Sequence, residues 1–421
     1  TVSMTGPFLT VIILYCLILT GLGWYGSQKN RSLSDFFTMS GKAGAILTGV
    51  AYFSTQYSMS TFMGVPGSIY HVGYAGMSVS VPGIAFSMLI PALLVGRRLI
   101  TLGHRYKMLT MADYLADRYE STGIRGLLAV LMLVFLVSMM GAQTIGGGVI
   151  FTTYTGAPEW VGITVMGVTV ILYCMAGGIR SIMLTDLIQG VLMVVTAVVT
   201  FFVSLELGGG LDVINAKLAA MDTNYVSFPG LEGKNSDFVV PLILQGGLSP
   251  VLSSLMVAGI FSAGMSTISS LLLTATSAAS RDLYQKILKR DATDEETWRL
   301  SKVITVVLGI IAIGIGISKP GSIFQIVLFA FGGLGIWAAP ILLGMYWRRA
   351  TTTSVYVGVI AAEILYVLIT LEFPSWSFGF NPLIVAWAFA MVVMILVSLV
   401  TKPVSDATIR RHFDDLDRHA D

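Results

Sequence analysis

Five hydroxyl side chains lie within one short apolar stretch of this chain, the run FSAGMSTISS at residues 261–270. On a helix, side chains three and four residues apart share a face. Positions 263, 266, 267, 270, 274 and 277 read Ala, Ser, Thr, Ser, Thr and Ser. Small residues also let membrane helices pack closely, which explains some of these hydroxyls but not a full stripe. Hydroxyl, carbonyl and carboxylate oxygens suit hard cations, so the stripe favours a cation site.

A carboxylate lies in another apolar run, GGIRSIMLTDLIQG, where Asp186 follows Arg180 by six residues. A charged side chain near mid-membrane costs at least ~2.5 kcal/mol on insertion scales, so it usually faces a partner or a water-filled path. Asp186 therefore either pairs with Arg180 at a helix end or holds a cation, and we favour the cation. A site with one carboxylate or none fits a monovalent ion such as sodium. These residues alone do not separate sodium from a proton.

A third polar stretch, AYFSTQYSMSTFMGVPGSIYHVGY at residues 51–74, carries several hydroxyl side chains ahead of Gly64, Pro66 and Gly67. Proline removes a backbone donor and clashes with the preceding turn, and glycine tolerates unwound backbone. Such backbone occurs at membrane depth only where it is buried in protein or lines a water-filled cavity. We predict a helix broken at a binding site here, and the alternative is a plain proline kink.

The composition indicates that membrane-embedded segments position these side chains. Of 421 residues, 55% are hydrophobic and 11% are charged, whereas a soluble domain carries about 25% charged residues. We therefore expect a protein surrounded by membrane lipid. The net charge of +2 gives no reason to expect a nucleic-acid partner, and Cys16 and Cys174 lie in apolar runs that predict neither a disulfide framework nor a metal site. No stretch suggests a soluble catalytic domain, so we expect no enzyme.

The apolar runs predict the membrane topology, because a spanning helix needs roughly 20 mostly apolar residues. We count eleven candidates, at about 7–25, 44–70, 77–100, 127–150, 160–177, 182–207, 246–280, 301–318, 322–347, 353–374 and 382–400. Cytoplasmic loops accumulate Lys and Arg. With the N-terminus outside, 22 of the 25 Lys and Arg residues fall on the inner side. This split predicts a cytoplasmic C-terminus, and the charged segment 406–421 is expected to be a solvated helix or tail.

Together these motifs resemble those of the sodium:solute symporter family, most closely its sodium/pantothenate branch. GGIRSIMLTDLIQG resembles the family's signature of Gly-Gly, Thr-Asp and Gln, and AGMSTISSLLL with the later RDLY resembles a second signature. STFMGVPGSIYHVGY resembles the family's broken first core helix. LFAFGGLGIWAAPILLGMYWRRA, residues 328–350, is close to the pantothenate branch in particular. The resemblance extends over nearly the whole chain.

The resemblance implies an all-α polytopic membrane protein with the inverted-repeat, LeuT-type transporter fold, in which five-helix repeats meet around a midplane site. Eleven spans are visible, but residues 223–250 are too short for the family's sixth and seventh core helices, so two core helices are missing from the chain. The expected divisions are an N-terminal accessory helix at 1–43, a first repeat at 44–207, an external loop with the gap at 208–245, the remaining second repeat at 246–350, accessory helices at 351–400 and a cytoplasmic tail at 401–421.

The resemblance also implies a set of binding residues, and one or two sodium ions. The main sodium site would use the carbonyls of Ser54, Tyr57 and Ala263 with the hydroxyls of Ser266 and Thr267. A second site, which some members have, would fall on Asp186, Ser266, Ser269 and Ser270. The solute would contact Gln56, Ser60, Thr61 and Gln143.

The function implied by the resemblance is sodium-coupled import of a small organic solute by alternating access, with a carboxylate such as pantothenate as the expected solute. Proline, sialic acid or another small solute are alternatives, as is a proton-coupled carrier on the same fold. The expected location is the plasma membrane, specifically a bacterial inner membrane. No oligomeric state is predicted.

Overall fold

The computed structural model of the chain describes residues 4–28, 32–38, 44–72, 89–108, 110–210, 212–214, 217 and 236–414. Every regular element within these ranges is helical, as the predicted all-α class requires. By its internal contacts the chain divides into two compact units. The first comprises residues 1–79, 136–280 and 292–327, and the second comprises residues 80–135, 281–291 and 328–421.

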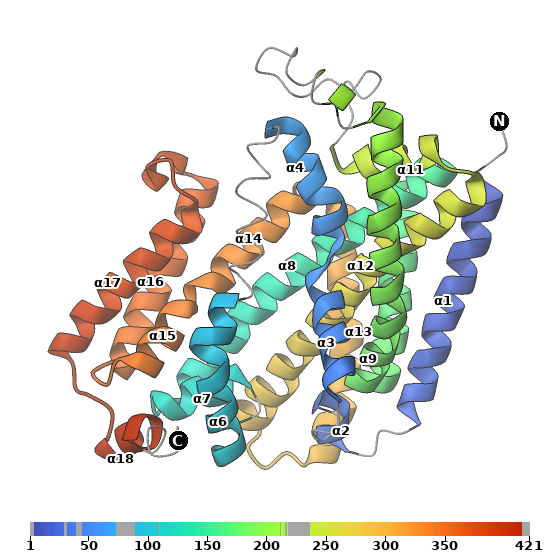
Figure 1. Cartoon of the computed structure of the whole chain (residues 1–421). Helices are drawn as coiled ribbons and strands as arrows, with labels where there is room; N and C mark the ends of the chain where they lie inside the picture. The colour runs from blue at the N-terminus through green and yellow to red at the C-terminus, as the bar shows by residue number, and fades with distance from the viewer. Residues whose placement is uncertain are drawn as a thin grey trace. The chain divides into compact units, whose positions relative to one another are not determined.

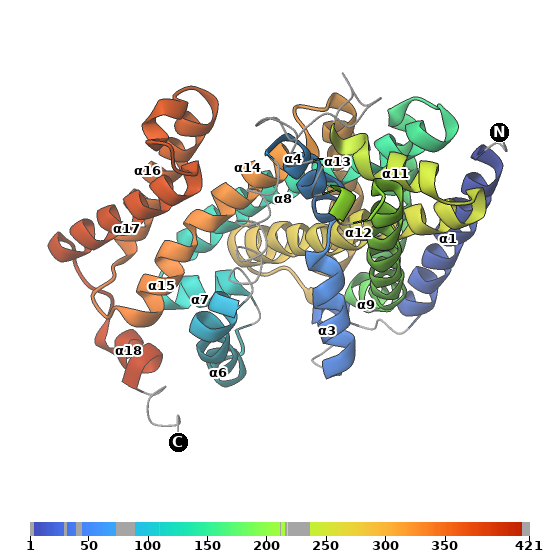
Figure 2. The ribbon, with the colours of Figure 1, turned by 45° about the horizontal axis from the view of Figure 1, so that its top comes forward.

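The first unit is built around α12 (Pro250–Ser277), which packs against α1, α3, α9 and α13 (Figures 1 and 2). α12 forms the first part of the candidate span Pro250–Leu288. In the apolar part of this span 83% of the residues are buried, the highest share of any candidate span in the described ranges. A helix buried on every side can carry polar groups on more than one face without exposing them to lipid. The other elements are α1 (Thr5–Ser27), α2 (Leu33–Thr38), α3 (Ala45–Gln56), η2 (Ser60–Gly64), α4 (Val65–Val72), most of α8 (Thr122–Thr155), α9 (Glu159–Gly208), η4 (Ser236–Phe238), α11 (Val239–Gly247) and α13 (Asp294–Ser318).

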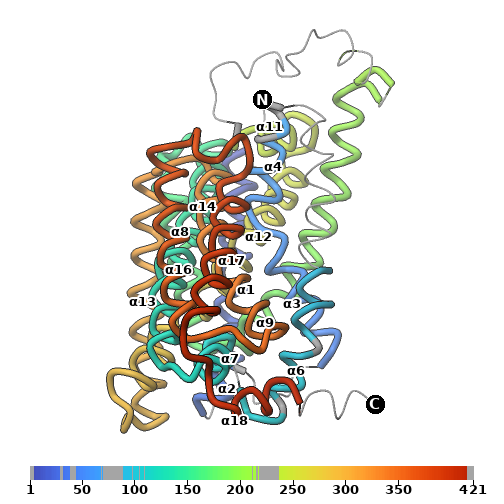
Figure 3. The backbone as a smooth tube through the Cα atoms, turned by 90° about the vertical axis from the view of Figure 1, so that its left-hand side faces the viewer, coloured from blue at the N-terminus to red at the C-terminus, as the bar shows by residue number. Residues whose placement is uncertain are grey.

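The second unit has its own hydrophobic core, in which Tyr114, Tyr119 and Trp337 are among the buried side chains. Its two long helices α16 (Thr352–Leu371) and α17 (Pro382–Val400) run side by side (Figure 3). The remaining elements are η3 (Ala92–Gly96), α6 (Arg97–Tyr106), α7 (Met111–Arg118), the start of α8, most of η5 (Ala278–Leu288), the end of α14 (Ile323–Ile336), α15 (Ala338–Tyr346), η6 (Pro374–Ser377), α18 (Asp406–Ile409) and η7 (Arg410–Asp414).

Eight helices in the described ranges are long and apolar enough to cross a membrane. Four of the eleven predicted spans account for this difference of three. The spans at 160–177 and 182–207 form the single kinked helix α9, and the span at 44–70 is divided into the short pieces α3, η2 and α4. Residues 77–88, half of the span at 77–100, lie outside the described residues, as do residues 223–235 of the predicted gap between residues 223 and 250.

The kink in α9 lies at Gly178, whose φ of 52° belongs to the left-handed region that glycine tolerates. A Cβ at this position would lie 2.4 Å from the backbone oxygen of Phe36. Both the backbone angle and the close approach of α2 therefore require glycine. The kink ends the first span of α9 and starts the segment that carries Asp186.

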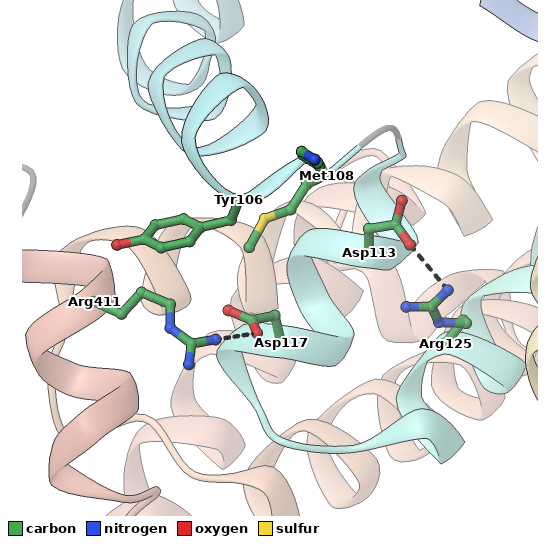
Figure 4. Close-up of a pocket in the computed structure, with 7 residues that line it drawn as sticks. Tyr106, Met108, Asp113, Asp117, Arg125 and Arg411 are labelled. Atoms are coloured by element: carbon green, nitrogen blue, oxygen red, sulfur yellow. Dashed lines mark hydrogen bonds and ion pairs between the residues drawn. The ribbon is translucent and has the colours of Figure 1, made fainter. Parts of the chain in front are cut away.

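Residues 406–414 are helical, as one of the two expected forms, but one face of this helix is docked, so the prediction that it is solvated is wrong for that face. His412 is 2% exposed, its Nε2 lies 2.7 Å from Asp117 Oδ2, and Arg411 Nη1 lies 2.5 Å from Asp117 Oδ1. Figure 4 shows the Arg411–Asp117 pair at a pocket of about 430 Å³ that Lys107 also lines. Burial alone would raise the pKa of Asp117, but its hydrogen bond with His412 and the charge of Arg411 outweigh burial and lower that pKa. Apolar burial of neighbouring Phe413 adds to these ion pairs.

Candidate functional site

The first core helix is broken, but the interruption lies at Tyr57–Ser58, ahead of the Gly-x-Pro-Gly run that predicted it. Tyr57 takes an extended conformation with ψ 97°, and the chain resumes as the π-helical turn η2 at Ser60. Pro66 lies in α4, which continues directly from η2, with Val65 between them in helical conformation. The proline therefore lies within the helical segment that follows the break and is not its cause.

Side chains satisfy the backbone donors that the break exposes. Gln143 of α8 accepts a hydrogen bond from Met59 N at 2.8 Å, and Thr61 Oγ1 accepts one from Ser58 N at 3.4 Å. Thr61 N donates in turn to the Ser58 carbonyl at 3.0 Å. Unpaired backbone groups are costly away from water, so these contacts are what allow unwound backbone inside this unit.

The same contacts release two carbonyl oxygens. In a continuous helix Ser58 N would donate to the Ser54 carbonyl and Thr61 N to the Tyr57 carbonyl. Here both N–H groups bond elsewhere, so the carbonyls of Ser54 and Tyr57 lose their helical partners. These are two of the three carbonyls predicted for a sodium site. The third, at Ala263, belongs to the continuous helix α12.

Asp186 is completely buried in the second half of α9. Its Oδ1 accepts a hydrogen bond from Ser266 Oγ at 2.7 Å, and its backbone oxygen accepts one from Ser54 Oγ at 2.9 Å. Its Oδ2 has no hydrogen-bond partner among the described residues, and within the same ranges no ion pair joins it to Arg180. A buried carboxylate oxygen without a donor is a position that either a proton or a cation can occupy.

The hydroxyl stripe of α12 connects this carboxylate to the broken helix. Thr267 Oγ1 donates to the Thr55 carbonyl at 3.0 Å, and Ser270 Oγ lies 2.8 Å from Thr55 Oγ1. Ser269 Oγ donates back to the Ser266 carbonyl at 2.8 Å. The structure thus connects Ser266 of α12 with Asp186 of α9, and Thr267 and Ser270 of α12 with Thr55 of α3. Ser269 bonds within α12 instead.

Of the predicted solute residues, Gln143 is the most deeply placed. It is fully buried, and its Nε2 has no hydrogen-bond partner within the described ranges. Ser60 is also buried, with its Oγ 2.6 Å from Ser58 Oγ, and Thr61 is half-buried. Gln56, the last residue of α3, has an exposed side chain, so the structure does not draw it into this buried group.

The sequence reasoning missed two polar residues close to Asp186, namely Gln189 and Tyr15. Gln189 Nε2 donates to the Tyr15 hydroxyl at 3.0 Å, and that hydroxyl lies 2.6 Å from Ser262 Oγ. Gln189 and Ser262 both stand in the quoted motifs, but Tyr15 comes from the N-terminal helix α1. No local pattern marks a contact between residues 174 and 247 positions apart.

Comparison with known proteins adds three findings. A family model described as the sodium:solute symporter family matches residues 36–235 and 225–362. The sodium/pantothenate symporter of Escherichia coli (strain K12) is 26% identical over 477 residues, which cover 94% of this chain and 97% of that protein. The sodium/proline symporter of the same strain is 21% identical, with 99% of this chain and 97% of that protein covered.

Among solved structures, the substrate-bound outward-open state of a Na⁺-coupled sialic acid symporter resembles this fold with a TM-score of 0.79. The match covers 95% of this chain and 98% of that one, at 18% sequence identity. At this identity the likeness shows the fold alone, the LeuT-type arrangement implied by the motifs.

Proposed function

The chain belongs to the sodium:solute symporter family and is a sodium-coupled solute symporter embedded in a membrane, not an enzyme, and we propose that it imports a small carboxylate such as pantothenate. The observation that carries the coupling proposal is the arrangement around Asp186. Asp186 is bonded to the polar helix α12 and has a second carboxylate oxygen without a donor among the described residues, next to a broken helix whose carbonyls are released. Carboxylate, carbonyl and hydroxyl oxygens are hard ligands, the type that suits a hard cation such as sodium.

We propose two sodium ions in adjacent sites. The main site takes the carbonyls of Ser54, Tyr57 and Ala263 with the hydroxyls of Ser266 and Thr267. The hydroxyl protons of both residues already point to other acceptors, so their oxygen lone pairs stay available to an ion. The second site takes Asp186 with Ser266, Ser269 and Ser270, and Ser266 is shared between the two.

Sodium binding then stabilises the broken helix against α9 and α12. A ligand shifts a conformational equilibrium only by its difference in affinity for the two states. Both sites draw ligands from more than one helix, so they form only while α3, α9 and α12 stay together. Sodium therefore favours the outward-open state first, and solute binding promotes the change to the inward-open state.

The solute assignment rests on relatives and on Gln143. The nearest motifs are those of the pantothenate branch, and two curated relatives transport pantothenate and proline by name. The amide donor of Gln143, which has no partner among the described residues, suits a solute that presents carboxylate or carbonyl oxygens, as do the hydroxyls of Ser60 and Thr61. Gln56 would contact the solute only in a conformational state in which its side chain points into the protein.

We also infer that two core helices are absent from the chain between residues 223 and 250. The alignment with the pantothenate symporter has 477 positions, more than the 421 residues of this chain. The two family matches overlap at residues 225–235, where the family pattern is interrupted. The five-helix repeats, the external N-terminus and the cytoplasmic C-terminus likewise remain predictions from the motifs and from the distribution of Lys and Arg.

The test is uptake of labelled pantothenate into proteoliposomes under an inward sodium gradient, with an equal potassium gradient as control. We expect accumulation that requires sodium. Sodium-dependent uptake of proline or sialic acid, with none of pantothenate, would keep the coupling and overturn the solute. Uptake that follows pH at fixed sodium and ignores the sodium gradient would replace sodium by a proton.

A further inference from the structure

The hydrogen bonds around Tyr15 run in one direction. Ser262 has a single hydroxyl proton, which it donates to the Ala258 carbonyl at 2.7 Å, so it accepts the proton of Tyr15. Having donated its only proton, the Tyr15 oxygen can only accept, and it accepts from Gln189 Nε2 at 3.0 Å. The order is therefore Gln189 to Tyr15 to Ser262 to Ala258.

This order determines which way the Gln189 amide lies. Its NH₂ group faces Tyr15, so its oxygen Oε1 faces away from Tyr15. Gln189 is fully buried, and Oε1 has no hydrogen-bond partner in the part of the chain that the structure describes. A reversed amide would set oxygen against the accepting Tyr15 oxygen, which is repulsive.

Gln189 lies one helical turn beyond Asp186, and residues three apart share a helix face. The pairing of α9 with α12 supports this placement. Asp186 reaches Ser266, Gln189 reaches Ser262 through Tyr15, and Thr196 donates to the Met256 carbonyl, so α9 residues meet α12 residues in descending order. Two buried acceptors, Asp186 Oδ2 and Gln189 Oε1, thus occur on successive turns of one face, and neither has a donor among the residues that the structure describes.

We propose that Gln189 contributes its amide oxygen to the cation site of Asp186, and that Tyr15 is a positioning residue that holds this amide in the binding orientation. The inference rests on the proposed sodium coupling. A neutral amide oxygen is a hard ligand that adds to the coordination of sodium without adding charge. The N-terminal helix, which lies outside the predicted repeats, would thereby take part in ion affinity.

The test compares Tyr15→Phe with Tyr154→Phe in sodium titrations of uptake by the full chain in proteoliposomes. Tyr154 is a matched control, because its hydroxyl lies 2.5 Å from Ser253 Oγ on the same helix α12 but away from Asp186. Losing one orienting hydrogen bond should raise the sodium concentration for half-maximal uptake about three- to tenfold. The maximal rate at saturating sodium should stay within about twofold, because Tyr15 touches neither ion nor solute.

A double-mutant cycle with Gln189→Ala completes the test. If Tyr15 acts through Gln189, the double variant should need no more sodium than Gln189→Ala alone. Equal effects of Tyr15→Phe and Tyr154→Phe, or additive effects of Tyr15→Phe and Gln189→Ala, would overturn the proposal and leave Tyr15 a packing residue. Wild-type uptake that ignores sodium would overturn the proposed function itself, so the two failures are distinguishable.

Discussion

Replacing Asp186 by Asn removes the one charge of the proposed second sodium site while it preserves size. Asn keeps an oxygen that can accept the hydrogen bond of Ser266, so packing of α9 against α12 should survive. Two opposite unit charges 4 Å apart attract by about 4 kcal/mol at an effective dielectric constant of 20. That energy corresponds to about a thousandfold in affinity, and the amide oxygen restores part of it, so we expect a loss of about a hundredfold.

The assay is a sodium titration of solute uptake, with Glu363→Gln as the matched control. Glu363 is another acidic side chain buried in a described span, 7% exposed in α16, and neither of its carboxylate oxygens has a hydrogen-bond partner in the described ranges. It has no hydroxyl stripe beside it, and we expect a structural role. Sodium activation of Glu363→Gln should therefore match the wild type. If Asp186→Asn also keeps its half-saturating sodium concentration within twofold, Asp186 binds no transported ion.

Three further predictions concern the main site, the kink and the tail. Thr267→Ala removes a proposed ligand and its bond to the Thr55 carbonyl, so the sodium requirement should rise about tenfold, with Thr267→Ser close to wild type; equal titrations for Ala and Ser would refute the hydroxyl's role. Gly178→Ala should lower the melting temperature of purified protein, because φ is positive and a Cβ would meet backbone, whereas Gly156→Ala, also at positive φ but with open space around it, should lower it less. Asp117→Asn should expose the tail to protease. The pKa of Asp117 is lowered in the folded protein, so the wild-type tail should stay protected from protease between pH 7 and pH 5. This protection should be lost only as the pH falls below the usual pKa range of an aspartate. Cleavage of the wild-type tail already at pH 5 would contradict this.

The site could be predicted where residue type alone carried the signal. A carboxylate and a row of hydroxyls are conspicuous in an apolar sequence, because burying them in a membrane costs free energy unless they have polar partners or bind a ligand. Asp186 and Ser266 are indeed in contact, at 2.7 Å. The broken helix was also predicted, but its position was wrong. Gly64, Pro66 and Gly67 lie within the helical segment after the break, whereas the unwinding at Tyr57–Ser58 depends on Gln143 and Thr61, whose contacts no local pattern reveals.

Long-range contacts explain the other differences. The tail is strongly charged and therefore looked solvated, but Asp117 is nearly 300 positions away in sequence and pairs with it in the fold. Tyr15 is an ordinary aromatic residue of an apolar helix until Gln189 and Ser262 are brought to it. Composition and periodicity describe one segment at a time, so they cannot identify partners that only tertiary packing provides.

The most direct test of the sodium sites is equilibrium binding of radioactive sodium to the purified protein, without solute or transport. We expect saturable binding of two ions per chain that excess potassium does not displace. Asp186→Asn should lower the count to one at moderate sodium concentrations, and Asp186→Asn combined with Thr267→Ala should abolish it. Wild-type protein that binds no sodium saturably, or an Asp186→Asn variant that still binds two ions with unchanged affinity, would contradict the account.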